Sequence, residues 1–194
     1  VAKTLEWKKG DHIITTANTF LATASCILHT GAVPEFVDID NINNTIDPNK
    51  TEDRIKKLKG KVKAIIAVDY AGHPCDWESL KFLSRKYNLK LVNDNCHAMG
   101  AKINGDKKYA TKFADIITQS YHPVKNITTG EGGAIFTNNQ RLYKKILILR
   151  NNGMIKQKDK YWEYRVNQLS MNFRVTDFQC ALGISQLKKL NMFI

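Results

Sequence analysis

Apolar runs of strand length alternate with amphipathic stretches of helix length along the chain. The clearest run is 62–68 (VKAIIAV), which is apolar apart from Lys63 and has the length of a buried strand. Further strands are predicted at 33–39, 89–92, 114–118 and 134–137, and helices at 18–30, 48–59, 76–87, 139–149 and 176–190. This alternation is typical of a layered α/β fold built on one central sheet.

Residues that commonly end or begin helices stand at the edges of the predicted helices. Gly31 suits the left-handed position that closes a helix. Asp76 and Asn139 suit the N-cap, because their side chains accept bonds from the first free amides. Thr176 and Gln179 have the spacing of a capping box. These signals support the helix boundaries that the apolar pattern predicts.

The predicted elements are interrupted at both ends of the chain. Residues 2–10 (AKTLEWKKG) predict a helix whose beginning is missing, and the chain stops at Ile194 directly after another predicted helix. Because natural domains rarely begin and end within packed elements, we expect residues 1–194 to be one unit truncated at both ends.

Composition is that of an ordinary globular protein, with 43% hydrophobic and 25% charged residues. No apolar run reaches the roughly 18 residues of a transmembrane helix, and the N-terminal residues lack a signal-peptide pattern. We therefore expect a cytoplasmic protein without a membrane partner. The net charge of +12 raises the alternative of a nucleic-acid-binding module. Its lysines are scattered and accompany no recognition motif, so we expect no nucleic-acid partner.

The four cysteines form no metal-ligand pattern. Cys26, Cys75, Cys96 and Cys180 include no CxxC pair and no ligand spacing with histidine. The sequence therefore predicts reduced thiols and no metal site.

Polar residues gather where three predicted strands end or begin. These segments are 93–98 (NDNCHA), 120–125 (SYHPVK) and 128–133 (TTGEGG). Ligands of α/β proteins bind at the carboxyl ends of strands. An aspartate there suits a cation or a protonated ring nitrogen, and a lysine on a glycine-rich turn suits a nucleophile or base. By residue type alone, a turn-capping Asp94 and a solvated Lys125 remain the alternative.

Longer strings connect these segments to a known family. DNCHAMGA, SYHPVKNITTGEGG and MNFRVTDFQCALG, in this order, resemble the DegT/DnrJ-type sugar aminotransferases, which depend on pyridoxal 5′-phosphate (PLP). The residues before and between them (GDHIITTANTFLATASCILHTGAVPEFVDID, VDYAGHPCDWESL) extend the resemblance over nearly the whole chain. It implies the three-layer, aspartate-aminotransferase-like large domain of PLP fold type I, with a mostly parallel central sheet.

The resemblance implies roles for six residues. Lys125 matches the lysine that holds PLP as a Schiff base, and Asp94 matches the acid that pairs with the pyridine nitrogen. His97 stands where the family often has a Gln that contacts the phenolic oxygen, and Ser120 matches the serine that binds the phosphate. Phe20 matches an aromatic residue that stacks on the ring. The sixth residue is Asn172, which matches an asparagine that reaches the phosphate of the neighbouring subunit.

The resemblance also implies partners and missing parts. An active site shared through Asn172 implies a homodimer. The family's upstream Gly-Thr or Gly-Ser phosphate loop and its smaller C-terminal domain both lie outside residues 1–194, so we expect this chain to be most of the large PLP-binding domain. The fragment alone is expected to be inactive.

The particular residues within these strings indicate one subgroup of the family. HPVKNITTGEGG, DNCHAMGA and VDYAGHPCD resemble most the subgroup that converts a UDP-linked 4-keto-6-deoxy sugar to its 4-amino form in pseudaminic acid synthesis, with glutamate as amino donor. Two alternatives share the fold. One is a PLP-dependent sugar dehydratase, in which histidine replaces the lysine, and the other is a non-catalytic regulatory protein. Lys125 and Asp94 favour transamination.

Overall fold

The computed structural model describes residues 1–157, 159–160 and 162–194. Its strands are β1 (His12–Thr16), β2 (Val33–Val37), β3 (Val62–Val68), β4 (Lys90–Asp94), β5 (Ile116–Ser120), β6 (Gly133–Phe136), β7 (Met154–Lys156) and β8 (Tyr164–Val166). Its α-helices are α1 (Leu21–Leu28), α2 (Pro48–Lys57), α3 (Trp77–Lys86), α4 (Tyr109–Phe113), α5 (Gln140–Arg150), α6 (Asp177–Leu187) and α7 (Leu190–Phe193), and a 3-10 turn covers Tyr70–Gly72.

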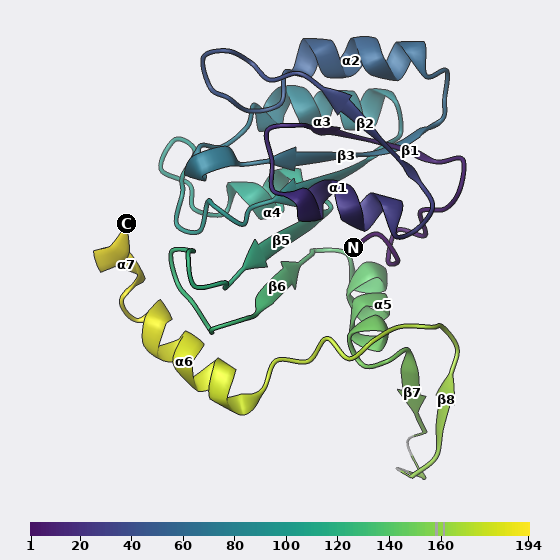
Figure 1. The fold of residues 1–194 in the computed structure, drawn as a ribbon, viewed down its shortest axis with the longest axis vertical. Helices are drawn as coiled ribbons and strands as arrows, with labels where there is room; N and C mark the ends of the chain where they lie inside the picture. The colour runs from purple at the N-terminus through teal and green to yellow at the C-terminus, as the bar shows by residue number, and fades with distance from the viewer. Residues whose placement is uncertain (158, 161) are drawn as a thin grey trace.

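A six-stranded sheet forms the centre of the molecule, in the order β2-β1-β3-β4-β5-β6 (Figure 1). The pairs from β2 to β5 are all parallel, and β6 is antiparallel to β5. The predicted mostly parallel sheet is therefore confirmed. Parallel pairing places the carboxyl ends of β1, β3, β4 and β5 along one edge.

Helices cover both faces of the sheet, which gives three layers (Figure 1). Strand residues alternate between the faces. Ile65 of β3 packs in the same cluster as Trp77 and Leu80 of α3, whereas the adjacent Ile66 packs in a second cluster with Ile27 of α1. Both sheet faces are thus buried, which explains why the central strand β3 is a nearly continuous apolar run.

The predicted helix ends are confirmed in detail. Asp76 Oδ1 accepts a hydrogen bond from Ser79 N, and the Asn139 side chain accepts from two backbone amides. Thr176 and Gln179 form the capping box reciprocally. Gly31 has φ +78°, in the left-handed region that it was expected to supply.

Two local predictions are wrong or incomplete. Residues 2–6 form turns instead of the predicted helix, and Glu6 has φ 59°, which breaks a right-handed helix. A segment of only about two turns before Gly10 offers too few hydrogen bonds to offset the cost of helix nucleation. Strand β1 was not predicted, because HIITT is short and half polar, although Thr15 and Thr16 are buried.

The chain after α5 extends away from the sheet (Figure 1). After α5 the chain forms the β7–β8 hairpin and then α6, whose Phe178 is 91% exposed. Several other large apolar side chains there are exposed, including Met171, Phe173 and Ile184. Among the described residues, no helix is long and apolar enough to cross a membrane.

Candidate functional site

The candidate site lies at the edge where the parallel strands end. Asp94 is the last residue of β4, paired with Val68 of β3 on one side and Thr118 of β5 on the other. Ser120 ends β5, and Lys125 follows in the loop between β5 and β6. The strands thus bring together the acid, the hydroxyl and the lysine predicted from the sequence.

Both carboxylate oxygens of Asp94 have donors. Thr23 Oγ1 donates to Oδ2 at 2.7 Å, and Cys96 N lies 3.3 Å from Oδ1. Thr23 is buried on α1, and its hydroxyl also lies 2.8 Å from Thr19 Oγ1. A carboxylate held on both oxygens has a restricted orientation, so Asp94 presents its charge in a fixed direction.

The loop that carries Lys125 is a structured hairpin connection. Lys125 N donates to His122 O, and Thr129 N donates to Tyr121 O. At Gly133 a Cβ would lie 2.5 Å from Gln119 O, so the close strand pairing there requires glycine. Helix α6 supports the loop, because Gln179 Nε2 donates to Glu131 O at 2.8 Å.

Charges of the site residues act on one another. Burial lowers the pKa of His97, and the positive charge of Lys125 lowers it further, whereas Asp94 raises it. Burial raises the pKa of the Cys96 thiol, and Asp94 adds to this effect, while Lys125 opposes it. Lys125 and Asp94 are therefore close enough to the same two side chains to share one electrostatic environment.

His97 is oriented by the turn that follows β3. Its Nδ1 accepts from Ala71 N at 3.3 Å, and its ring centroid lies 6.0 Å from that of Tyr70. With Nδ1 used as an acceptor, the neutral ring carries its proton on Nε2. His97 can therefore donate a hydrogen bond to an oxygen at the strand edge, as a Gln would.

Ser120 and Phe20 both border the same edge. Ser120 Oγ accepts from His122 N at 3.3 Å, and its hydroxyl proton is a further donor. Phe20 directly precedes α1, the helix whose Thr23 contacts Asp94, and its side chain is 72% exposed. An exposed aromatic ring beside a polar edge is suited to cover a planar ligand.

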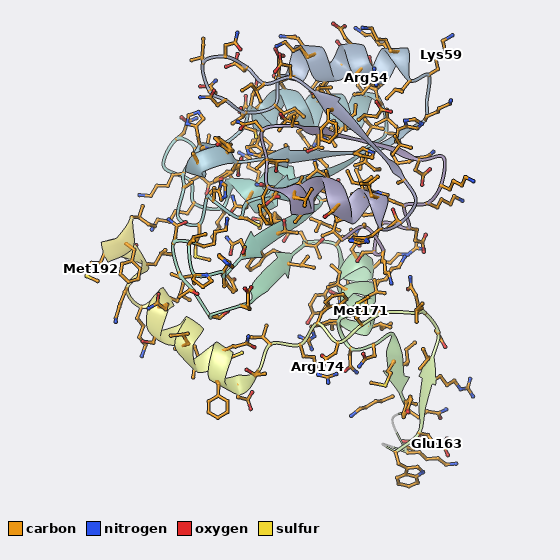
Figure 2. All side chains as sticks on the ribbon, viewed as in Figure 1. Arg54, Lys59, Glu163, Met171, Arg174 and Met192 are labelled. Atoms are coloured by element: carbon orange, nitrogen blue, oxygen red, sulfur yellow. The ribbon has the colours of Figure 1, made fainter. Side chains whose placement is uncertain are left out.

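Asn172 is not brought to this edge within the chain. Its Oδ1 accepts from Arg174 N, and its backbone pairs with Asn151 after α5. Figure 2 shows Met171 and Arg174 near α5, apart from the strand ends.

Two residues of the site were missed by sequence reasoning. Thr23 and Asp69 were assigned no role, although Thr23 bonds Asp94 and Asp69 bonds both of its neighbours. No local signal marked either residue, because these contacts join residues far apart in the chain.

We predict that Thr23→Val destabilises the protein. Valine keeps the shape but removes the donor to the Asp94 carboxylate, so the free energy of unfolding should fall by about 1.5–3 kcal/mol. Thr23→Ser keeps the hydroxyl and loses a methyl group, which should cost only about 0.8 kcal/mol. Urea denaturation measures both. Equal stability of the valine variant and the wild type would show that this bond is unimportant.

Comparisons with known proteins place the fold in a defined class. The structure superposes on *Helicobacter pylori* PseC, described as an aminotransferase involved in the biosynthesis of pseudoaminic acid, with a TM-score of 0.86 and 36% identity over 97% of this chain. It also superposes on NtdA of *Bacillus subtilis* with bound cofactor PMP, with a TM-score of 0.87 and 32% identity over 98% of this chain. The fold is thus that of the PLP-dependent aminotransferases, as predicted.

The family follows from the sequence match. The model of the DegT/DnrJ/EryC1/StrS aminotransferase family matches residues 2–194, and the chain belongs to this family. A UDP-4-amino-4,6-dideoxy-N-acetyl-β-L-altrosamine transaminase of *Campylobacter jejuni* is 43% identical over 179 residues, which is 92% of this chain and 46% of the relative. The chain also covers 50% of PseC and 41% of NtdA, so it spans about half the length of these relatives.

Proposed function

We propose that the complete protein is a PLP-dependent aminotransferase that converts a nucleotide-linked 4-keto-6-deoxy sugar to the 4-amino sugar, with glutamate as amino donor. The observation that carries the proposal is the position of Lys125 and Asp94 at the same edge of the sheet: Asp94 ends β4, and Lys125 lies in the loop that follows the neighbouring strand β5. Residues 1–194 would form most of the large cofactor-binding domain.

The residues at this edge fit PLP in chemical type. The cofactor has an aldehyde, a ring nitrogen, a phenolic oxygen and a phosphate. Lys125 offers an amine, Asp94 a carboxylate held by Thr23, and Ser120 a hydroxyl donor. These three anchors come from neighbouring strand ends, and His97 offers Nε2–H to an oxygen between them.

When bound, PLP supplies a ring that accepts the electrons of the carbon being deprotonated. Lys125 would hold the cofactor covalently through Nζ and, once displaced, carry the proton between the substrate carbon and the cofactor. Asp94 would keep the proton on the ring nitrogen by its negative charge. Phe20 would cover the ring face, and Ser120 would donate to the phosphate.

A homodimer would complete the phosphate site. We propose that Asn172 of the partner subunit contributes there, because its own segment lies apart from the strand edge (Figure 2). Exposed Met171 and Phe173 flank Asn172 on both sides, and burying them against a second subunit would remove apolar surface from water. In this arrangement Ser120 of one chain and Asn172 of the partner subunit would both donate to the same phosphate.

The sugar is proposed from the relatives. The *C. jejuni* relative is named for a UDP-linked substrate and PseC for pseudoaminic acid synthesis, so we propose a UDP-linked 4-keto sugar and a cytoplasmic role in surface-glycan synthesis. The dehydratase alternative is disfavoured because a lysine occupies position 125.

The deciding experiment incubates the complete protein with PLP, glutamate and a panel of UDP- and dTDP-linked 4-keto sugars. We expect an amino sugar and 2-oxoglutarate to form together, and we expect UDP-linked sugars to be aminated faster than dTDP-linked sugars. A deoxygenated sugar without a new amino group, formed while glutamate is oxidised to 2-oxoglutarate and ammonia, would identify a dehydratase. No turnover of any sugar by protein that binds PLP would favour the regulatory alternative.

A further inference from the structure

A buried carboxylate beneath the strand edge has no role in the function proposed above. Asp69 follows β3 and is fully buried, at 0% exposure. Its Oδ1 accepts from Cys75 N at 2.9 Å and Trp77 Nε1 at 3.0 Å. Its Oδ2 accepts from Asn93 Nδ2, Asn95 Nδ2 and Tyr109 Oη at 3.0, 2.9 and 2.7 Å.

These contacts join Asp69 to the residues on either side of Asp94. In a strand, residues 93 and 95 face one side and residue 94 faces the other. Both asparagines are fixed to the same Asp69 oxygen, and the Asp69 backbone N donates to the Asp94 carbonyl at 3.1 Å. Asp69 therefore contacts three consecutive residues and leaves the Asp94 side chain facing Thr23.

The Asp69 carboxylate also determines how the amide of Asn93 is oriented. A carboxylate accepts hydrogen bonds, so Asn93 must turn Nδ2 toward Asp69. Its Oδ1 is then buried and has no partner among the described residues. The bond to Asp69 therefore fixes the orientation of the Asn93 amide.

A second connection leads from Asp69 toward the lysine loop. Asn95 Oδ1 accepts from Gln119 Nε2 at 3.1 Å, and Asn95 N donates to Thr118 O at 2.9 Å. Gln119 lies beside Ser120, the last residue of β5. The end of β4 and the end of β5 are thus held together through Asn95.

From these contacts we infer that Asp69 is a positioning residue: it sets the geometry of Asp94, and through it the affinity for the cofactor, without touching the cofactor itself. This inference rests on the proposed function, in which Asp94 pairs with the PLP ring nitrogen. Groups that orient a ligating side chain typically change affinity or activity about 10- to 100-fold when removed, as outer-shell partners of metal ligands do.

The test compares variants that disturb different sides of Asp69. Asp69→Asn replaces an acceptor oxygen by a donor facing other donors, and Asn95→Ala removes the side-chain bond that holds the residue after Asp94 to Asp69, together with the bond from Gln119. Trp77→Phe is the matched control, because it removes an equally buried bond to Asp69 on the α3 side. For each variant of the complete protein, we measure the PLP dissociation constant, the induced circular dichroism of bound PLP and the urea midpoint.

We expect Asp69→Asn and Asn95→Ala to raise the PLP dissociation constant about 10- to 100-fold. Trp77→Phe should lower the urea midpoint and leave the dissociation constant and the dichroism unchanged. If Asp69→Asn does not fold, the inference is tested by comparing the PLP dissociation constants of Asn95→Ala and Trp77→Phe. An unchanged dissociation constant in Asn95→Ala, or an equal rise in Trp77→Phe, would overturn the inference.

The same measurements separate this inference from the proposed function. If the wild-type protein binds no PLP, the proposed function fails and Asp69 has no cofactor to affect. If Asp94→Asn weakens PLP binding but Asp69→Asn and Asn95→Ala do not, Asp94 keeps its role and only the positioning by Asp69 is refuted.

Discussion

Lys125→Ala should abolish covalent attachment of PLP to the protein. The amine of Lys125 is the group expected to bond the cofactor, and an alanine offers no nucleophile. Borohydride reduction of the wild-type protein with PLP should add one cofactor mass to the peptide that contains Lys125, and the variant should show no such peptide. The rate of amination should fall by about 10²- to 10⁴-fold, which is the usual contribution of a positioned acid–base group.

A surface lysine provides the control for this experiment. Lys102 is exposed and lies after the Asp94 segment, so Lys102→Ala removes a similar amine outside the lysine loop. This variant should trap PLP as well as the wild type does. Equal trapping by Lys125→Ala would mean that another amine bonds the cofactor, and the assignment of Lys125 would be wrong.

The parts of the fold that the sequence predicted are those with a strong local signal. Strand β3 was predicted with its observed bounds, because a nearly continuous apolar run between polar residues has few other solutions. Strand β1 was missed since two of its residues, Thr15 and Thr16, are polar and yet buried. Burial of a threonine depends on its neighbours in the sheet, which local sequence does not show.

Part of the candidate site could likewise be predicted from the sequence, and part could not. Asp94, Ser120 and Lys125 were predictable because each follows a recognisable strand and lies within a distinctive string. The contact between Thr23 and Asp94 joins residues 71 positions apart, and nothing near either residue indicates it. The polar partners of the Asp94 segment, Thr23 and Asp69, could therefore be identified only from the structure, in which α1 and the end of β3 pack against β4.

Asp94→Asn should leave the fold intact and remove most of the catalytic rate. Asparagine has the same shape and its amide oxygen can still accept from Thr23, so the contacts of α1 with β4 should persist, and only the longer bond from Cys96 N to the second oxygen is lost. It carries no negative charge, however, and a protonated ring nitrogen beside it would lose its counter-ion. Leaving a buried charge unpaired costs about 3–5 kcal/mol, which corresponds to about 10²- to 10⁴-fold in rate if the cost falls on the rate-limiting step.

Two measurements make the Asp94 prediction specific. The urea midpoint of Asp94→Asn should stay close to that of the wild type, while glutamate-dependent amination falls. Borohydride should still attach PLP to Lys125 in this variant, because the amine is unaffected. Asp94→Glu is the matched charge control: it keeps the carboxylate but lengthens the side chain, so it should retain more activity than Asp94→Asn. If the two variants lose equal activity, the position of Asp94 matters and its charge does not, and its proposed pairing with the ring nitrogen fails.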